Sequence, residues 1–235
     1  MGTICITGSA SGIGAATRRR LEADGHAVVG VDLRDAEVVA DLATPDGRAA
    51  MVDGVAAASG GSLDGLVAAA GVQGTGASLV VAVNYFGAVA TLGGLRPLLA
   101  RGSDASAVAI SSNSSTTMRG VDPVTVDACL AGDEARARAA AEAAGPFVDY
   151  PSTKLALARW VRRQAPGAAW IGAGIRLNAV APGPTATPMT DDLAVPVLEL
   201  GDAYPVPIQR VATPDEQAAV LAFLLSPESS YVVGA

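Results

Sequence analysis

Short apolar segments alternate with longer segments that carry one polar face through most of the chain. Uninterrupted apolar runs are typical of strands buried on both faces of a parallel sheet, and longer amphipathic runs are typical of helices. The pattern predicts strands over Thr3–Thr7, Ala27–Val31, Val38–Ala40, Leu66–Ala70 and Ala107–Ser111, and helices over Ala15–Ala23, Asp46–Ala58 and Leu79–Ala100. This alternation indicates an α/β fold with helices on both faces of a parallel sheet.

The alternation stops in the middle of the chain, over residues 113–149. Within this stretch, Asp122 followed by proline and Asp133 both have the form of helix N-caps. Gly145-Pro146 has the form of a helix stop signal. We interpret Pro123–Ala144 as a helical hairpin that is inserted into the regular pattern.

The alternation then resumes, with a helix expected over Pro151–Gln164, a strand over Ile175–Ala181 and a helix over Pro214–Leu225. Between the last two lies a long Pro-rich segment, residues 184–214. It carries the large apolar residues Met189, Leu193, Val195, Val197, Leu198 and Leu200, among others. Long segments without regular structure in compact domains are usually functional, so we expect a mobile lid over a hydrophobic substrate.

Glycines are concentrated between the first predicted strand and the first predicted helix, at Gly8, Gly12 and Gly14. Such a turn allows the backbone to approach a pyrophosphate, which then faces the N-terminus of the helix. An ordinary glycine-rich turn is the alternative. The strand, the glycines and the helix nevertheless follow one another in the order that a dinucleotide site requires.

Asp32 ends the second predicted strand, close to the roughly 20-residue offset at which a carboxylate binds the adenosine ribose hydroxyls. A carboxylate at this position would repel the 2′-phosphate of NADP, so Asp32 favours NAD as the cofactor. Arg34 leaves binding of a 2′-phosphate open as the alternative.

Tyr150 stands four residues before Lys154, the only lysine of the chain, so the two side chains share one face of a predicted helix. An adjacent ammonium, together with the positively charged nicotinamide ring of the coenzyme, favours the phenolate. Lys154 and that ring should therefore lower the pKa of Tyr150 toward the range that is useful for proton transfer at neutral pH. A solvated pair on the helix surface is the alternative, but the glycine turn makes a catalytic pair the better interpretation.

Thr7-Gly8-x-x-x-Gly12-x-Gly14 and Tyr150-x-x-x-Lys154 are the two signature motifs of the short-chain dehydrogenase/reductase family, which the chain resembles from its first residue to its last. The resemblance implies a Rossmann-type fold, with a single-domain, doubly wound parallel sheet flanked by helices over residues 1–235. It also implies that residues 113–149 form a helical insertion and that residues 184–214 form a substrate lid.

The same resemblance implies roles for individual side chains. Ser112 would stabilise the substrate oxygen. Alternative hydroxyls for that role are Ser111, Ser114 and Ser115. Asn84 would complete a proton relay, although it could instead serve to bend its helix. Cofactor-binding residues would be Gly8, Ser11, Gly12, Ile13, Gly14, Asp32, Leu33, Ala70, Gly71, Tyr150, Lys154, Pro182, Gly183, Thr185 and Thr187, with Asp41 and Leu42 beside the adenine.

Within the family, the segments Gly25–Val38 and Val83–Ala88 and the insertion resemble the bacterial 3α-hydroxysteroid dehydrogenase/carbonyl reductase group. Three features depart from the family, the first being that residues 189–214 follow no single substrate-defining pattern. Ala68-Ala69 stands where two asparagines help to hold the central sheet, and Val232–Ala235 stands where the last strand would begin. Either the chain continues further or its last strand differs.

The composition excludes several other classes of protein. Half of the 235 residues are hydrophobic, yet no apolar run reaches the roughly 18 residues of a membrane span. The net charge of −7, with scattered arginines, argues against binding to nucleic acid. Two cysteines and one histidine complete neither a typical zinc site nor a disulfide framework. We therefore expect a cytoplasmic protein without a metal site or a membrane partner.

These observations together predict an enzyme that interconverts a secondary alcohol and a ketone with NAD(H), on a steroid-like, alicyclic or aryl substrate. A dinucleotide-binding regulator or scaffold without turnover is the alternative function. Many members of the family pair through two long helices, here Leu79–Ala100 and Pro151–Gln164. Since the insertion lies beside that surface and could cover it, we expect a homodimer that forms through another surface, or with the insertion as part of the contact, rather than a tetramer.

Overall fold

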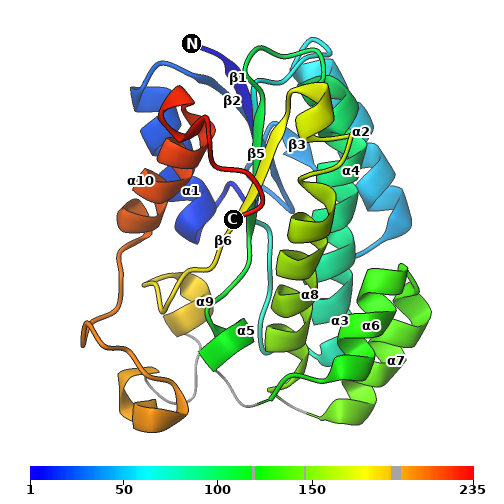
Figure 1. Ribbon diagram of the computed structural model, residues 1–235, viewed down its shortest axis with the longest axis vertical. Coiled ribbons are helices and arrows are strands. Elements are labelled where there is room, and N and C mark those ends of the chain that lie inside the picture. Colours follow the sequence, from blue (N-terminus) through cyan, green and yellow to red (C-terminus); the bar gives the residue numbers. More distant parts are fainter. Residues whose placement is uncertain (118–119, 146, 192–196) are drawn as a thin grey trace.

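Six parallel strands form one central sheet in the part of the chain that the structure describes, in the order β3-β2-β1-β4-β5-β6 (Figure 1). They are β1 (Thr3–Thr7), β2 (Ala27–Asp32), β3 (Val38–Val39), β4 (Gly65–Ala68), β5 (Ser106–Ile110) and β6 (Arg176–Val180). The strand order reverses between β1 and β4, and ligands of open α/β sheets bind outside the strand ends at such a point. The computed structural model describes residues 1–117, 120–145, 147–191 and 197–235.

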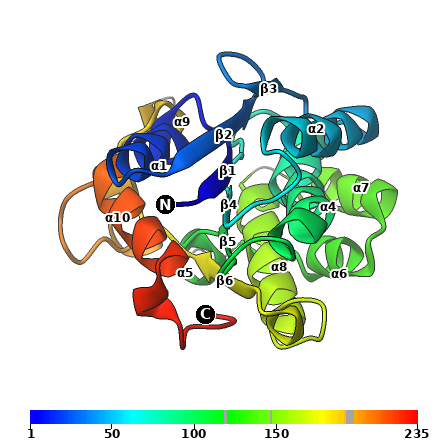
Figure 2. The ribbon, with the colours of Figure 1, turned by 90° about the horizontal axis from the view of Figure 1, so that it is seen from above.

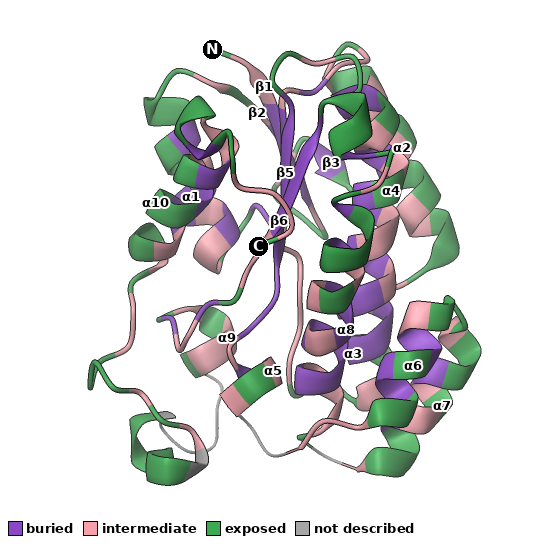
Figure 3. Cartoon of the chain, viewed as in Figure 1, coloured by how far each residue is buried: buried purple, intermediate pink, exposed green. Residues whose placement is uncertain are grey.

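Helices cover both faces of this sheet (Figure 2). One face carries α1 (Gly12–Ala23) and α10 (Pro214–Leu225), and the other carries α2 (Pro45–Ala58), α4 (Ala88–Leu99) and α8 (Asp149–Gln164). The remaining helical segments are α3 (Ala77–Val81), η1 (Ala82–Gly87), α5 (Ser114–Thr117), α6 (Pro123–Ala131), α7 (Glu134–Ala144), η2 (Ile171–Ala173), α9 (Pro188–Asp191), η3 (Val197–Ala203) and η4 (Pro227–Ser229). All residues of β4 and β5 are buried between the two layers (Figure 3). The predicted α/β fold with a parallel sheet is thereby confirmed.

The long helix predicted over Leu79–Ala100 is continuous from Ala77 to Leu99, but its middle turn, η1, is π-helical. The sequence pattern did not predict this wider turn. Among the described residues, this helix alone is long and apolar enough to cross a membrane, yet 61% of its most apolar window is buried inside the protein. It therefore has the character of a core helix.

The insertion is a helical hairpin, as predicted, and packs against α8 and α3 (Figure 1). The Asp122 carboxylate caps α6 by accepting from the N–H of Thr125 over 2.7 Å, and the Asp133 carboxylate caps α7 by accepting from the N–H of Arg136 over 3.0 Å. Gly132 ends α6 in the left-handed conformation, with φ of 76°. The local cap signals were sufficient to place both helices, although Pro146 lies outside the described residues.

Residues 184–214 contain regular structure, contrary to the expectation of an irregular segment. Both α9 and η3 lie within them, and the two ends of the segment meet, since the N–H of Ala186 donates to the carbonyl of Ala212 over 2.8 Å. Leu193 and Val195 lie outside the described residues. The segment forms a loop that is rooted between β6 and α10.

The C-terminal residues run alongside β6 and continue the hydrogen bonding of the sheet. The N–H of Gly234 donates to the carbonyl of Leu177 over 2.9 Å, and the carbonyl of Ala235 accepts from the N–H of Ala179 over 2.8 Å. This is the edge of the sheet at which the family's last strand is expected.

Arg176 attaches the end of α10 to this edge of the sheet. Its buried guanidinium donates to the carbonyl oxygens of Leu224, Leu225, Ser226 and Ser229 and to Ser229 Oγ, over 2.6 to 3.4 Å. The last carbonyls of a helix have no partner within the helix, so they need an external donor when they are buried. Arg176 supplies that donor to several of them at once.

Replacing Arg176 with Met should lower the free energy of unfolding by about 3 kcal/mol, because buried carbonyls would be left unpaired. Urea denaturation followed by circular dichroism measures the change. The control is Arg162→Met, at an exposed arginine of α8, which should cost less than about 0.5 kcal/mol. Equal effects of the two substitutions would show that Arg176 has no capping role.

Candidate active site

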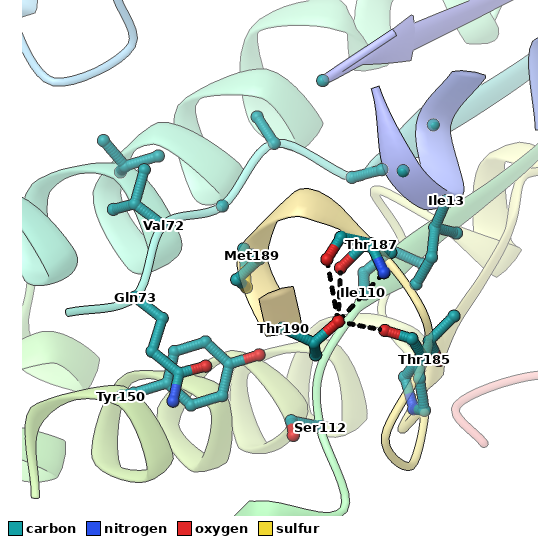
Figure 4. Close-up of a pocket in the computed structure, with 18 of the residues that line it drawn as sticks. Ile13, Val72, Gln73, Ile110, Ser112, Tyr150, Thr185, Thr187, Met189 and Thr190 are labelled. Atoms are coloured by element: carbon teal, nitrogen blue, oxygen red, sulfur yellow. Dashed lines mark hydrogen bonds between the residues drawn. The ribbon is translucent and has the colours of Figure 1, made fainter. Parts of the chain in front are cut away.

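A cavity of about 640 Å³ opens at the carboxyl ends of the strands, beside the point where the strand order reverses (Figure 4). Every residue that the sequence predicted to bind a cofactor lines it, and so do the predicted catalytic residues Ser112, Tyr150 and Lys154. Asn84 does not line the cavity but lies directly behind its wall. No group of three or more His, Cys, Asp or Glu side chains that could hold a metal ion occurs among the described residues.

The glycine turn forms a cradle that only residues without a side chain can form. Gly8 has a φ of 71°, and a Cβ added at Gly14 would lie 2.0 Å from the Gly8 carbonyl oxygen. A Cβ at Gly12 would lie 3.2 Å from the Thr187 side chain. Ser11, the N-cap of α1, makes no side-chain capping bond to the first turn of the helix. Ser11, Gly12 and Ile13 line the cavity, so the N-terminus of α1 faces it, as a pyrophosphate site requires.

The Asp32 carboxylate is held at the end of β2 by two backbone groups. It accepts from the N–H of Leu33 over 2.7 Å and from the N–H of Ala10 over 3.0 Å. The Arg34 side chain is 86% exposed and does not line the cavity. The geometry thus brings the carboxylate, and not the guanidinium, to the site.

Asn84 lies in the π-helical turn η1 and is completely buried. Its Oδ1 accepts from the N–H of Val72 over 2.8 Å, and its Nδ2 donates to the carbonyl of Val72 over 2.9 Å. A Cβ added at Gly71 would lie 3.2 Å from Asn84 Oδ1 and 3.4 Å from Lys154 Nζ. Asn84 therefore holds the chain after β4 and also lies close to Lys154. A structural role of Asn84 is thus compatible with a role in a proton relay.

The serines near the end of β5 have distinct partners. Ser111 Oγ donates to the Lys154 carbonyl over 2.8 Å, and Ser115 Oγ donates to the Ser112 carbonyl over 2.7 Å. Ser112 Oγ accepts from Ser114 Oγ over 2.9 Å and from the N–H of Ser114 over 3.2 Å. Since Ser114 donates both bonds, the proton of Ser112 remains available to a group in the cavity. Among the serines considered, the geometry favours Ser112.

Lys154 is buried, and its Nζ donates to the Ile110 carbonyl over 2.8 Å and lies 5.6 Å from the centre of the Tyr150 ring. Burial lowers the pKa of Lys154 from 10.5 to about 8. Burial also raises the pKa of Tyr150, an effect that the Ser112 hydroxyl opposes. In the chain without coenzyme, Lys154 alone thus does not lower the pKa of Tyr150, because desolvation of the phenol dominates and the ammonium is directed to a backbone carbonyl.

Several lining residues were not singled out by the sequence. They include Val72, Gln73, Phe147, Thr190 and Tyr204. The hydroxyl of Tyr204 donates to Asn113 Oδ1, and burial raises the pKa of Tyr204 to about 12. Thr190 Oγ1 donates to the Thr185 carbonyl over 2.7 Å and so holds the chain after β6 against α9 (Figure 4). No motif marks these side chains, because their roles depend on how the loops pack.

Comparison with known protein families shows the family to which the chain belongs. The sequence profile described as short chain dehydrogenase matches residues 2–123, which is more than half of the chain. The chain belongs to the short chain dehydrogenase family. A second profile of that group, described as enoyl-(acyl carrier protein) reductase, matches residues 136–235.

Individual relatives of this short chain dehydrogenase cover nearly its whole length. It is 45% identical to the 3-alpha-hydroxysteroid dehydrogenase/carbonyl reductase of Comamonas testosteroni, over 100% of this chain and 93% of the relative. It is 33% identical to a coniferyl-alcohol dehydrogenase of a Pseudomonas strain, over 98% and 92% of the two chains. Among solved structures, it is similar to the 3-alpha-hydroxysteroid dehydrogenase of Pseudomonas sp. B-0831 in complex with NADH. The identity is 43%, the TM-score is 0.90, and 99% and 92% of the two chains are covered.

Replacing Lys154 with Met should stabilise this short chain dehydrogenase at pH 7. Below about pH 8 the folded chain holds a buried ammonium, whereas the unfolded chain holds a solvated one with a pKa of 10.5. The shift corresponds to about 3 kcal/mol. Loss of the bond to Ile110 offsets part of this amount, which leaves a net gain of about 1–2 kcal/mol.

The sign of the pH dependence follows from the lowered pKa. The gain should be complete below about pH 8 and should shrink as the pH rises toward 10.5, because the folded chain then binds fewer protons than the unfolded chain. Urea unfolding of the wild type and the variant at both ends of this range measures it. Equal free energies of unfolding at pH 7 would show that burial of Lys154 carries no cost.

Proposed function

We propose that this short chain dehydrogenase interconverts a secondary alcohol and a ketone on a hydrophobic substrate, with NAD(H) as coenzyme. The proposal rests on one observation: the side chains of Ser112, Tyr150 and Lys154 meet in the cavity that also contains the glycine cradle. The relatives' names, which are those of alcohol dehydrogenases and of a carbonyl reductase, agree with this chemistry.

The residues present fit NAD(H). The cradle at Gly8, Gly12 and Gly14 and the N-terminus of α1 would hold the pyrophosphate, and Asp32 would bind the adenosine ribose. Lys154 would bind the nicotinamide ribose. When bound, the coenzyme supplies or accepts the hydride. The NADH complex of the similar Pseudomonas enzyme supports this choice.

The protein's own groups would move the proton and hold the reacting oxygen. In reduction, the hydroxyls of Ser112 and Tyr150 donate hydrogen bonds to the substrate carbonyl, and Tyr150 then transfers its proton to that oxygen. The ammonium of Lys154 stabilises the phenolate that results. Because burial raises the Tyr150 pKa, the phenol holds its proton at neutral pH until the substrate oxygen takes it. Asn84 would order the water that returns the proton. Oxidation of the alcohol is the reverse.

We infer that described residues of the segment 184–214 form the substrate side of the cavity. Met189, Leu200 and Tyr204 line the cavity from that segment, and Val72 and Phe147 line it from other parts of the chain. Apolar walls with a few convergent hydroxyls are typical of sites for hydrophobic small molecules. We therefore infer that a steroid-like, alicyclic or aryl carbonyl compound binds there.

Oxidation of NADH in the presence of a panel of alicyclic, aryl and steroid ketones tests the function, with Tyr150→Phe as the decisive variant. The variant should lose roughly 100-fold or more in kcat, because it lacks the proton donor. Its Kd for NADH, measured by fluorescence, should stay within about twofold, because the glycine cradle is unchanged.

Two results would overturn the assignment. Turnover of the Tyr150→Phe variant above roughly a tenth of the wild-type rate would remove Tyr150 from the reaction. NADH binding by the wild type without turnover of any ketone or alcohol would favour the other function, that of a dinucleotide-binding regulator.

Asp32 should determine the preference for NAD over NADP. Asp32→Asn keeps the size of the side chain and removes its charge, so the ratio of kcat/KM for NADH to that for NADPH should fall by roughly 10- to 100-fold. Asp35→Asn is a matched control in the same loop, because the Asp35 side chain is 83% exposed and does not line the cavity. Equal ratios in Asp32→Asn and in the wild type would exclude Asp32 as the determinant.

The assembly that we propose is a homodimer whose contacts are set by the insertion. The hairpin packs against α8 and α3, beside the surface through which related proteins are expected to pair. Light scattering of the wild type, and of a variant with residues 122–145 replaced by a short turn, measures the assembly. We expect a dimer for the wild type and a different state for the variant. Tetramers in both would contradict a role of the insertion.

We further infer a cytoplasmic location. Cys5 and Cys129 are both free and buried. Burial raises the pKa of each thiol, to about 12 for Cys129, which keeps them protonated and unreactive. Buried unpaired thiols of this kind agree with a reducing compartment.

A further inference from the structure

Glu134, the first residue of α7 in the inserted hairpin, holds two arginines. Its Oε2 accepts from Arg48 Nη1 over 2.7 Å and its Oε1 from Arg48 Nη2 over 3.0 Å. Its Oε1 also accepts from Arg138 Nη2 over 2.5 Å. The side chains of Arg48 and Glu134 are only 11% and 24% exposed. This ion pair therefore joins α2 to the insertion away from bulk water.

Both arginines also bind the backbone of the loop between β3 and α2. Arg48 Nε donates to the Leu42 carbonyl over 2.8 Å, and Arg138 Nη2 donates to the Ala43 carbonyl over 3.2 Å. Arg48 Nη2 donates in addition to the carbonyl of Ala82, the first residue of the π-helical turn, over 3.0 Å. The guanidinium groups thus connect the insertion, the loop and η1.

The same loop is a wall of the cavity. Asp41 and Leu42 line it on the side of Asp32, which is the adenosine side of a dinucleotide site. Close packing leaves the loop little room: a Cβ added at Gly47 would lie 2.0 Å from the Asp41 carbonyl oxygen, and one at Gly87 would lie 3.1 Å from Leu42 Cβ. In this wall, the carbonyls of Leu42 and Ala43 are the groups that accept from Arg48 and Arg138.

We propose that Glu134 is a positioning residue for the coenzyme: it orients Arg48 and Arg138, which hold residues 41–43 in the place where the adenosine half binds. The inserted hairpin thereby sets the affinity for the coenzyme without touching it. This inference rests on the proposed binding of NAD(H). Without the Glu134 carboxylate, the two guanidinium groups repel each other and turn toward solvent, which releases the loop carbonyls.

Glu134→Gln tests the proposal, since it keeps the size of the side chain and removes its charge. The Kd for NADH, measured by fluorescence titration, should rise roughly tenfold, the amount expected for loss of charge-assisted hydrogen bonds. The kcat at saturating NADH should stay within about twofold. Glu142→Gln, at an exposed residue of the same helix, is the matched control and should leave the Kd unchanged.

Two ligands, each corresponding to one half of NADH, distinguish a positioning role of Glu134 from a general loss of structure in the variant. Binding of AMP, which occupies only the adenosine side, should weaken in Glu134→Gln as binding of NADH does. Binding of reduced nicotinamide mononucleotide, which lacks adenosine, should not change. If the two half-ligands weaken equally, or if neither weakens, the proposal is wrong.

Arg48→Lys provides a second variant in case Glu134→Gln does not fold. The lysine keeps a cation beside Glu134 but cannot donate to several carbonyls at once. Binding of AMP and NADH should therefore weaken as it does in Glu134→Gln. Unchanged binding of both ligands in a folded Arg48→Lys variant would also overturn the proposal. If the wild type itself does not bind NADH, the proposed function fails. If the wild type binds NADH and the variants bind it equally well, only the positioning role fails.

Discussion

Two reciprocal hydrogen bonds between α8 and the end of β5 determine where the groups of the proposed reaction lie. Lys154 Nζ donates to the Ile110 carbonyl over 2.8 Å, and Ser111 Oγ donates to the Lys154 carbonyl over 2.8 Å. The helix that carries Tyr150 is thereby locked to the strand that leads into Ser112. A phenol and a hydroxyl from distant parts of the chain can then face one substrate oxygen.

This arrangement places an ammonium where burial disfavours its charge. The lowered pKa of Lys154 is the measure of that cost, which a chain selected for stability alone would avoid. Gly71 contributes by leaving space, since a side chain there would press on Asn84 and on Lys154. Asn84 in turn binds both backbone groups of Val72. Where the family's asparagines are replaced by alanines, this bond still holds the chain after β4.

Two parts of the coenzyme side of the cavity, the glycine turn and the wall at residues 41–42, are held in place by different interactions. The glycine cradle depends on a backbone turn, with positive φ at Gly8 and Gly12, and on close approach of residues such as Ala70 and Thr187. The wall at Asp41 and Leu42 depends instead on charged side chains from α2 and the insertion. An added helical hairpin can therefore influence the coenzyme site as well as the outer surface of the protein.

Features that depend on neighbours within a few residues could be predicted from the amino-acid sequence. Strands such as β1, the caps at Asp122 and Asp133 and the glycine turn are of this kind, because a cap or a turn is complete within about one helical turn of the chain. The two family motifs then predicted the members of the site. The site residues lie close together because the carboxyl ends of the parallel strands meet at one edge of the sheet.

Features that depend on residues far apart in the chain became visible in the folded structure. The pair Arg48 and Glu134 spans 86 positions, and no periodic pattern or motif marks it. The choice of Ser112 among its neighbouring serines depended on which hydroxyls are already engaged, and the raised pKa of Tyr150 depended on how deeply packing buries it. Partners and burial of this kind are set by packing, which a local pattern of polar and apolar residues does not specify.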